Sequence, residues 1–389
     1  MAGLPGRSVA PRPSVPVRPF RGRLYRLCAR LLAILPLCAA PAAAQSPEPP
    51  DVPAPRAELI RATVPVILPG GVDSNSPAVW TLQRGLLRLH VTTSIDGRPS
   101  VAAGPNLARL GQARSIDLDP WPGGGVWMEA IVPDVDGTWY GYFHNEIPSP
   151  LCEDQTKMAP RIGAARSVDS GASWEYLGVI LEAPPESVDC GSPNTYFVGG
   201  VGDFSVQLSP DGQDLYLFYS AYPSRGARQG IAAARLAWAD RDAPVGKIMV
   251  WHDTAWLPAT TAPEGDEPRV RYPLGVPLFP TPDPFHGPTD TVDAFWGPSV
   301  HWNTHLEQYV MLMNHALDES FGQEGIYVSF SPTLDDPHAW TPPAPLLTGG
   351  RWYPQVLGLD LETGTDRTAG EYARFFMGGR SDYLIRFVK

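Results

Sequence analysis

Five times along the chain, a short apolar segment is followed, after a turn, by a second segment rich in aromatic and β-branched residues. Each segment has the length of a strand and is bounded by turn residues, and helical periodicity is weak throughout. The one helix candidate, GIAAARLAWADRD, reads equally well as a strand and a turn. We therefore expect an all-β protein. The five pairs are NSPAVW with LLRLHVTTS, VWMEAIVPD with GTWYGYFHNE, GDFSVQLSPDG with QDLYLFYSAY, WGPSVHWNTHLE with QYVMLMNHA, and WYPQVLGLD with ARFFMGG.

The recurrence also limits how these strands can assemble. Five sheet-like units of four strands fit a five-bladed β-propeller with four-stranded antiparallel blades. A pair of β-sandwiches is the alternative, and we prefer the propeller because the same two-strand signature occurs five times. Residues 58–389 are long for one ordinary domain, but a modular ring accommodates them, so we assign all of them to one propeller.

The stretch ARSVDSGASWEYLG is a further indication of a propeller. It matches the pattern Ser-x-Asp-x-Gly-x-x-Trp with Ser167, Asp169, Gly171 and Trp174. Asp169 can accept hydrogen bonds from turn amides, Gly171 can adopt a positive φ, and Trp174 can pack beneath the hairpin. The pattern resembles the Asp-box turn of sialidases and other propellers, so Asp169 is interpreted as a folding residue. A sialidase itself is not favoured, because three convergent arginines and a Tyr nucleophile are not evident.

The chain as a whole resembles the five-bladed propeller superfamily of arabinanases, β-xylosidases, invertases and levansucrases, which are glycoside hydrolases of families 43, 32, 68 and relatives. The resemblance covers residues 58–389 as an architecture and a rhythm. The strings NSPAVW, GDFSV, FWGPSVHWN and WYPQV are similar to those of a bacterial branch of it. The invertase-type strings Trp-Met-Asn-Asp-Pro-Asn-Gly and Arg-Asp-Pro are absent from the sequence.

Carboxylates mark the starts of the first three repeats. In a propeller the innermost strand of each blade lines the central channel, so residues at these starts converge although they lie far apart in sequence. Reading these positions gives Asp73, Glu129 and Asp203. Asp73 could instead cap a turn with Asn75, and the GGVG run before Asp203 could simply form a loop. Glu129 lies between apolar residues, where an unpaired carboxylate is unfavourable.

Three convergent carboxyl groups suit glycoside hydrolysis. One must stay protonated to donate to the leaving oxygen, and another must be ionised to activate water or to attack the anomeric carbon. The resemblance implies that Asp73 is the base or nucleophile, while Glu129 and Asp203 divide the roles of acid and pKa modulator. The superfamily usually has Glu as the third-blade acid, whereas this chain has Asp203, so we favour Glu129 as the acid by chemical type.

The repeat starts also offer groups that could bind a sugar. An indole can stack on the apolar face of a sugar ring while polar neighbours bind its hydroxyls. Blade packing is the alternative role for the tryptophans, and a satisfied structural position is the alternative for the histidine. The substrate-binding candidates are Asn75, His144, Trp296, Ser299, Trp352 and Gln355.

No cofactor and no metal-ligand spacing are evident in the sequence. Some members of the superfamily hold a calcium or a water-filled site with a His at the channel, and His144 could reach that position. The expectation from the residues is therefore that the chemistry needs no metal, with a structural calcium as the one exception that the resemblance leaves open.

The first 44 residues have the pattern of a secretory signal. Seven arginines and no acidic residue precede the apolar run LLAILPLCAAPAAAQS, which is too short to span a bilayer and ends in a small-residue cleavage site. Residues 45–57 are Pro-rich and are expected to form a disordered linker. We expect a secreted or periplasmic protein without a membrane anchor, and a monomer.

Removal of this segment makes the chain more acidic. Of 30 Lys and Arg residues 23 remain, against 41 Asp and Glu, so the net charge is near −18. This balance disfavours nucleic acid and anionic membranes as partners.

Cys28 and Cys38 lie within the predicted signal, so Cys152 and Cys190 remain as an even pair in an exported chain. Such a pair predicts a disulfide, worth about 3–4 kcal/mol in the chain-entropy account. A metal site or a nucleophilic thiol is the alternative, but no His-rich or Cys-x-x-Cys spacing accompanies either residue.

The sequence thus predicts an exported glycoside hydrolase that acts on a furanoside or a pentose-containing glycan. Two other functions stay open. A carbohydrate-binding propeller would need the aromatic residues but not three carboxylates, and a protein-binding propeller of the envelope would turn the carboxylates into loops. Their convergence in an open pocket is the feature that separates these functions.

Overall fold

The computed structural model describes residues 54–389, apart from 225–228, 265–266 and 282–291. The predicted signal at 1–44 and most of the predicted linker at 45–57 lie outside the described residues. Residues Pro53–Lys389 form one compact unit. In the ranges that the structure describes, no helix has the length and apolar character needed to cross a membrane. The helical elements there are four short 3-10 turns, Leu107–Arg109 (η1), Pro185–Ser187 (η2), Trp238–Asp240 (η3) and Pro337–Ala339 (η4).

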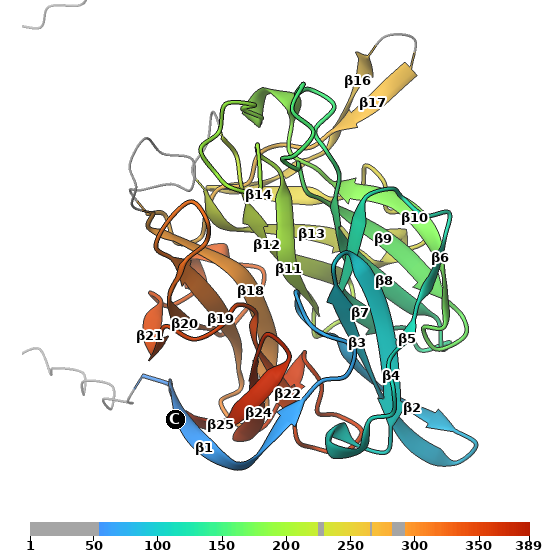
Figure 1. The fold of residues 1–389 in the computed structure, drawn as a ribbon, viewed down its shortest axis with the longest axis vertical. Helices are drawn as coiled ribbons and strands as arrows, with labels where there is room; N and C mark the ends of the chain where they lie inside the picture. The colour runs from blue at the N-terminus through green and yellow to red at the C-terminus, as the bar shows by residue number, and fades with distance from the viewer. Residues whose placement is uncertain (1–53, 225–228, 265–266, 282–291) are drawn as a thin grey trace, which may run out of the picture. The chain divides into compact units, whose positions relative to one another are not determined.

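Strands make up the rest of the regular structure, and they form five large sheets that follow one another around a ring (Figure 1). Blade 1 contains β2 (Ala78–Gln83), β3 (Leu86–Ile95), β4 (Arg98–Gly104) and β5 (Arg114–Ser115). Blade 2 contains β7 (Gly125–Pro133), β8 (Trp139–Glu146), β9 (Arg161–Ser167), β10 (Ser173–Leu181) and β6 (Asp117–Asp119). Blade 3 contains β11 (Val201–Leu208), β12 (Asp214–Ala221), β13 (Gly230–Ala237), β14 (Met249–His252) and β15 (Ala255–Pro258).

Blades 4 and 5 complete the ring. Blade 4 contains β18 (Ala294–Asn303), β19 (Gln308–Ala316), β20 (Gln323–Ser331), β21 (Ala344–Thr348) and β23 (Thr368–Ala369). Blade 5 contains β22 (Pro354–Gly358), β24 (Tyr372–Met377), β25 (Arg380–Val388) and β1 (Arg56–Ile67). A separate hairpin of β16 (Thr260–Glu264) and β17 (Glu267–Arg271) lies between blade 3 and blade 4 in the sequence.

The first strand closes the ring. β1 pairs antiparallel with β25, from Arg56 opposite Val388 to Ile67 opposite Arg380, so the two ends of the domain share one blade. The strand begins at Arg56, two residues before the expected start of the domain at residue 58. This pairing ties the start of the domain to its last strand, with β1 as the outer edge of blade 5.

The predicted five-bladed propeller is confirmed, and the five predicted segment pairs coincide with the strand pairs β2–β3, β7–β8, β11–β12, β18–β19 and β22–β24. The number of strands per blade is four or five rather than four throughout. The additional strands β6 and β23 pair parallel with β10 and β18, so the blades are not purely antiparallel. The helix candidate forms the strand β13 followed by the 3-10 turn η3.

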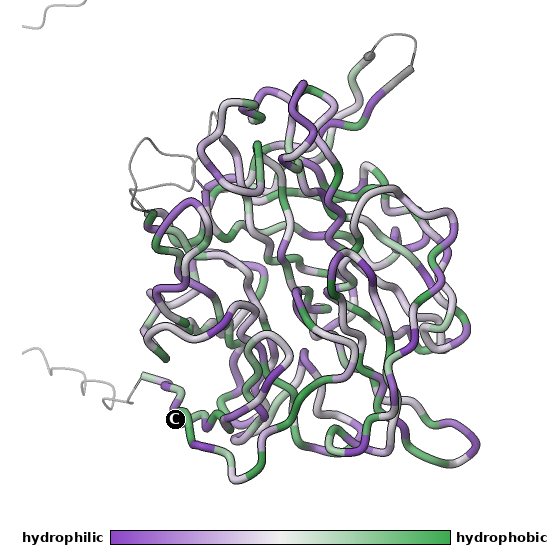
Figure 2. Tube along the Cα trace, viewed as in Figure 1, coloured by the Kyte–Doolittle hydropathy of each residue, from purple (hydrophilic) through white to green (hydrophobic). Residues whose placement is uncertain are grey.

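Apolar clusters lie between neighbouring blades. Phe204 and Leu217 of blade 3 pack with Tyr142 of blade 2, and Met311 of blade 4 packs with Phe218 of blade 3. Similar clusters join blades 4 and 5, 1 and 2, and 5 and 1. Because both faces of an inner strand are covered, its sequence is nearly continuously hydrophobic rather than alternating, and hydrophobic stretches run along strands around the ring (Figure 2).

The Asp-box turn forms between β9 and β10 as predicted. Asp169 Oδ1 accepts hydrogen bonds from the N–H groups of Ala172 and Ser173 at 3.0 and 2.9 Å. Gly171 has a φ of +83°, and Trp174 is buried below the hairpin. This carboxylate is therefore engaged by its own turn, on the outer part of blade 2.

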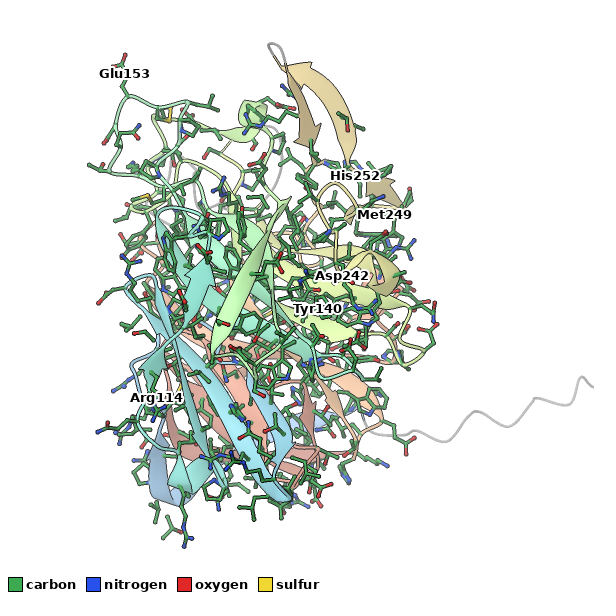
Figure 3. The ribbon with its side chains drawn as sticks, turned by 90° about the vertical axis from the view of Figure 1, so that its right-hand side faces the viewer. Arg114, Tyr140, Glu153, Asp242, Met249 and His252 are labelled. Carbon is green, nitrogen blue, oxygen red and sulfur yellow. A yellow bond between two sulfur atoms is a disulfide. The ribbon has the colours of Figure 1, made fainter. Side chains whose placement is uncertain are left out.

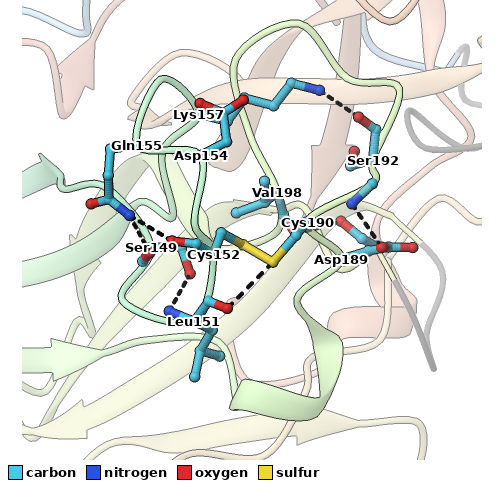
Figure 4. The surroundings of a disulfide bond; sticks show 12 residues. Ser149, Leu151, Cys152, Asp154, Gln155, Lys157, Asp189, Cys190, Ser192 and Val198 are labelled. Carbon is cyan, nitrogen blue, oxygen red and sulfur yellow. Dashed lines mark hydrogen bonds between the residues drawn. A yellow bond between two sulfur atoms is a disulfide. The ribbon is translucent and has the colours of Figure 1, made fainter.

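The predicted disulfide between Cys152 and Cys190 is also present (Figure 4). It joins the connection between β8 and β9 to the connection between β10 and β11. Disulfides persist in oxidising compartments, which agrees with a location outside the cytoplasm.

Candidate active site

A cavity of about 140 Å³ lies where the innermost strands of the five blades begin. Every blade contributes to its wall. Asp73 comes from the segment before β2, Trp127 and Glu146 from blade 2, Asp203 from β11, Trp296 and Phe321 from blade 4, and Trp352 and Tyr353 from the segment before β22, while Tyr196 and Phe197 come from the connection that leads into β11.

β-Bulges explain how two carboxylates leave the apolar pattern of their strands. The pairing of β7 with β8 is interrupted at Glu129, between Met128 and Ala130. The pairing of β11 with β12 is interrupted at Asp203, between Gly202 and Phe204. A bulge inserts one extra residue and changes the direction of its side chain. Each carboxylate therefore leaves the apolar packing between the blades that its neighbours maintain.

Asp73 is the carboxylate of blade 1 on the cavity wall. Its backbone N–H donates to the Ser94 carbonyl at 2.7 Å, which fixes the segment before β2. Partial burial and then the charges of Asp203 and Glu146 raise the pKa of Asp73 to about 6. This carboxyl group therefore changes charge close to neutral pH.

Glu129 lies behind the wall rather than on it, with a residue exposure of only 2%. Its Oε2 accepts a hydrogen bond from the Phe204 N–H at 2.8 Å, which links blade 2 to blade 3. Its Oε1 lies 3.8 Å from His144 Nδ1 and has no hydrogen-bond partner among the described residues. Burial, and then the neighbouring Asp203, raise the pKa of Glu129 well above its ordinary value.

Asp203 lies next to Glu129 and reaches the cavity. The Tyr222 hydroxyl donates to Oδ2 at 2.5 Å, and the Tyr353 hydroxyl donates to Oδ1 at 3.4 Å. Burial raises the pKa of Asp203, although His144 and the Tyr222 hydroxyl oppose the shift. Its backbone φ is +40°, in the left-handed region that few residues other than glycine adopt.

His144 connects the carboxylates of blades 2 and 3. Its Nδ1 accepts a hydrogen bond from the Asp203 N–H at 2.9 Å, and its Nε2 lies 3.1 Å from Glu146 Oε1. Burial lowers the pKa of His144, but Asp203, Glu146 and Glu129 outweigh it and raise the pKa to about 9. An Nδ1 that accepts an N–H belongs to the neutral ring, so protonation at Nδ1 requires the backbone at Asp203 to shift.

Aromatic side chains form much of the remaining wall. The Trp296 ring is nearly perpendicular to that of Trp352, with centroids 5.4 Å apart, and it also meets Phe321 at 5.1 Å. Phe321 and Tyr353 have φ values of +60° and +58°. Positive φ is unusual for bulky residues and concentrates at functional sites, where surrounding packing maintains it.

Three of the predicted substrate-binding residues lie outside the cavity wall. Asn75 Nδ2 donates to the carbonyls of Phe204 and Pro298 at 2.9 and 3.0 Å. Gln355 accepts from the Ser76 N–H at 2.6 Å and donates to its carbonyl at 3.0 Å, which ties blade 5 to blade 1. Ser299 is buried and does not line the cavity. The side-chain amides of Asn75 and Gln355 therefore link different blades. They form hydrogen bonds with backbone groups at the inner rim that are not paired within a sheet.

Of the other predicted residues, Trp296 and Trp352 line the cavity and His144 lies directly behind it. The predicted site residues do not include Glu146, Tyr222 and Phe321, which line the cavity or contact Asp203. Glu146 ends β8, Tyr222 directly follows β12, and Phe321 lies in the connection that follows β19. In an antiparallel pair, the end of the second strand lies beside the start of the first, so that position could have identified them.

Glu129, His144 and Asp203 each place one potential metal-ligating atom within 4.8 Å of the others. Calcium prefers six to eight oxygen ligands, whereas this set includes a nitrogen that already accepts the Asp203 N–H. Oxygens of Glu129 and Asp203 accept hydrogen bonds from Phe204 and Tyr222. The residues as placed do not fit the structural calcium that the resemblance left open.

Comparison with known proteins gives distant structural likenesses. A scan of protein-family models and a search of curated proteins find no match. Among solved structures, the chain is similar to a thermostable family-43 glycoside hydrolase (13% identity, TM-score 0.47, 83% of this chain and 91% of that one). It is also similar to the endo-arabinase of Bacteroides thetaiotaomicron (11%, 0.47, 83% and 97%) and to a GH62 hydrolase in complex with xylotriose (12%, 0.44, 85% and 97%).

Proposed function

We propose that this protein is an exported glycoside hydrolase that cleaves a furanoside or a pentose-containing glycan. The observation that carries the proposal is the group of three carboxyls, Asp73, Glu129 and Asp203, beside one aromatic-walled cavity and all with raised pKa values. Glycosidic cleavage needs one carboxyl that keeps its proton and another that is ionised. The substrate class follows the sequence resemblance, and the disulfide supports export.

The geometry supports a division of roles that differs from the one expected from the sequence. A general acid must come within hydrogen-bond distance of the leaving oxygen. Asp203 reaches the cavity, whereas Glu129 is buried behind it. We therefore assign Asp203 as the acid, because burial and the charge of Glu146 raise its pKa, and Glu129 as a positioning residue whose Oε2 holds the Phe204 N–H next to Asp203. Asp73, with a pKa of about 6, is ionised above that pH and is assigned as the base or nucleophile.

The aromatic wall supplies the binding surface in this proposal. Trp296 and Trp352 are both on the wall and could stack on the apolar face of a sugar ring. A carbohydrate-binding protein without catalysis remains the second candidate, because the same wall would serve it. The two candidates differ in whether the carboxyl groups are needed for anything beyond binding.

The test is release of reducing sugar from a panel of plant and bacterial glycans by the purified mature chain. Asp73→Asn and Asp203→Asn should abolish release while retaining the unfolding midpoint. Asp366→Asn is the matched control, because burial also raises the pKa of Asp366 to about 6 but it lies outside the cavity wall. Tight binding to one glycan without release would favour the binding protein. If the chain releases no sugar and binds none of the glycans, the proposal is overturned.

A further inference from the structure

One wall of the cavity is a segment that is fastened on both sides. Residues 188–198 connect β10 to β11 and place Tyr196 and Phe197 on the wall. On the blade 2 side, Cys190 is bonded to Cys152, and the Lys157 ammonium donates to the Ser192 carbonyl (Figure 4). The Met158 N–H donates to the Tyr196 carbonyl at 2.8 Å, and the Val198 N–H donates to the Met158 carbonyl at 3.0 Å.

The same segment reaches across to blade 4. The Thr195 N–H donates to the Glu319 carbonyl at 3.2 Å, and its hydroxyl lies 2.6 Å from that of Ser320. The rings of Tyr196 and Phe197 each lie 5.9 Å from Phe321. These contacts join the segment that follows blade 2 to a loop of blade 4, although the sheets of blades 2 and 4 are not adjacent in the ring.

Blade 5 continues this wall. Trp352 Nε1 donates to the Phe321 carbonyl at 2.9 Å, and Trp352 packs against Trp296. Loops from blades 2 to 5 are thus joined into one continuous side of the cavity. A polymer that runs through a site needs a groove with two open ends, whereas these contacts tie together the loops on one side of the cavity.

The volume of the cavity agrees with a single occupant ring. It measures about 140 Å³, close to the roughly 150 Å³ of an engineered protein cavity that accepts one benzene molecule. We propose that the site accepts only the terminal residue of a glycan, and that the fastened segment 188–198 determines this chain-end specificity. This inference takes its substrate class from the proposed function, whereas its argument from the cavity and the segment does not depend on that function.

Linear arabino- and xylo-oligosaccharides blocked by methylation at one end or the other provide the test. Blocking the end that enters the cavity should weaken binding by about tenfold or more, which corresponds to about 1.4 kcal/mol, while blocking the other end should have little effect. Catalysis should release only monosaccharide at early times. Equal binding of both blocked series, or early release of longer products, would overturn the inference.

Variants of the segment separate its role from general stability. Thr195→Ala combined with Ser320→Ala removes the hydroxyl contact to blade 4 and keeps the disulfide, and Cys152→Ser with Cys190→Ser removes the disulfide. Either variant should reduce the discrimination between the two blocked series. Thr156→Ala is the matched control, because the Thr156 hydroxyl bonds to the exposed Asp154 instead. Unchanged discrimination in both variants would refute the role of the segment. If no glycan is cleaved but one blocked series still binds more weakly, the proposed function fails and chain-end recognition stands.

Discussion

Replacing Glu129 by glutamine should make the stability of the protein less dependent on pH above about 6.5. Asp73, Glu129, Asp203 and His144 all have raised pKa values in the folded state. The unfolded chain releases these protons at ordinary values, up to 6.5 for histidine. Above that pH the folded protein binds more protons than the unfolded chain, so the stability contributed by the raised carboxyl groups is lost as the pH rises. His144 acts with the same sign, up to a pKa of about 9, once its Nδ1 takes up a proton and the Asp203 N–H turns away.

The magnitude follows from proton linkage. Each proton that only the folded state retains changes the free energy of unfolding by about 1.4 kcal/mol per pH unit, or about 3 kcal/mol over two units. Two other buried histidines oppose this trend only at lower pH, because burial lowers the pKa of His90 to about 4 and that of His301 to about 3. Glutamine keeps an acceptor for the Phe204 N–H but carries no proton to lose, and it also removes a charge that raises the pKa of His144.

Urea unfolding at several pH values between about 6.5 and 8.5, read by linear extrapolation, measures this effect. The wild type should lose stability across the range, and Glu129→Gln should lose markedly less and be the more stable protein at the alkaline end. Glu153→Gln is the control, because Glu153 is exposed on the surface (Figure 3). Parallel curves for the wild type and Glu129→Gln would refute the buried-proton account.

Four further outcomes are expected. Hydrolytic activity should fall as the pH drops through about 6, because Asp73 becomes protonated, and a pH–rate profile would show this. Asp169→Ala should lower stability by about 1 kcal/mol, measured by urea unfolding, because turn amides lose their acceptor. Reduction of the Cys152–Cys190 bond should lower it by about 3–4 kcal/mol, seen as a lower unfolding midpoint with reductant. Deletion of residues 54–67 should abolish cooperative thermal unfolding, because it removes β1, which closes the ring.

The sequence predicts the ring well because its two determinants are local. The five inner strands carry apolar residues on both faces, since each is covered by two neighbouring blades. Each strand also has its own turn residues, and the Asp-box needs only the residues from Ser167 to Trp174. Local signals of this kind survive in a single sequence.

The depth of each side chain could not be predicted in the same way. Asp73, Glu129 and Asp203 occupy similar places in their repeats, but Glu129 is buried behind the wall while the others reach the cavity. Glu129 and Asp203 both lie at bulges, and the insertion of one residue into an apolar run leaves no distinct sequence mark. The contact between Thr195 and Ser320 spans 125 residues, so its prediction needs the finished ring.

Several energetically unfavourable features lie around this cavity. Asp203, Phe321 and Tyr353 have positive φ values, and Glu129 keeps an oxygen without a hydrogen-bond partner among the described residues. Binding a sugar would not require Glu129, because its side chain does not reach the cavity. What it does affect is the proton affinity of His144, because the charge of Glu129 raises the pKa of that ring. A buried carboxyl that touches no ligand but acts on the histidine beside Asp203 is useful for acid–base chemistry, and this favours catalysis over binding alone.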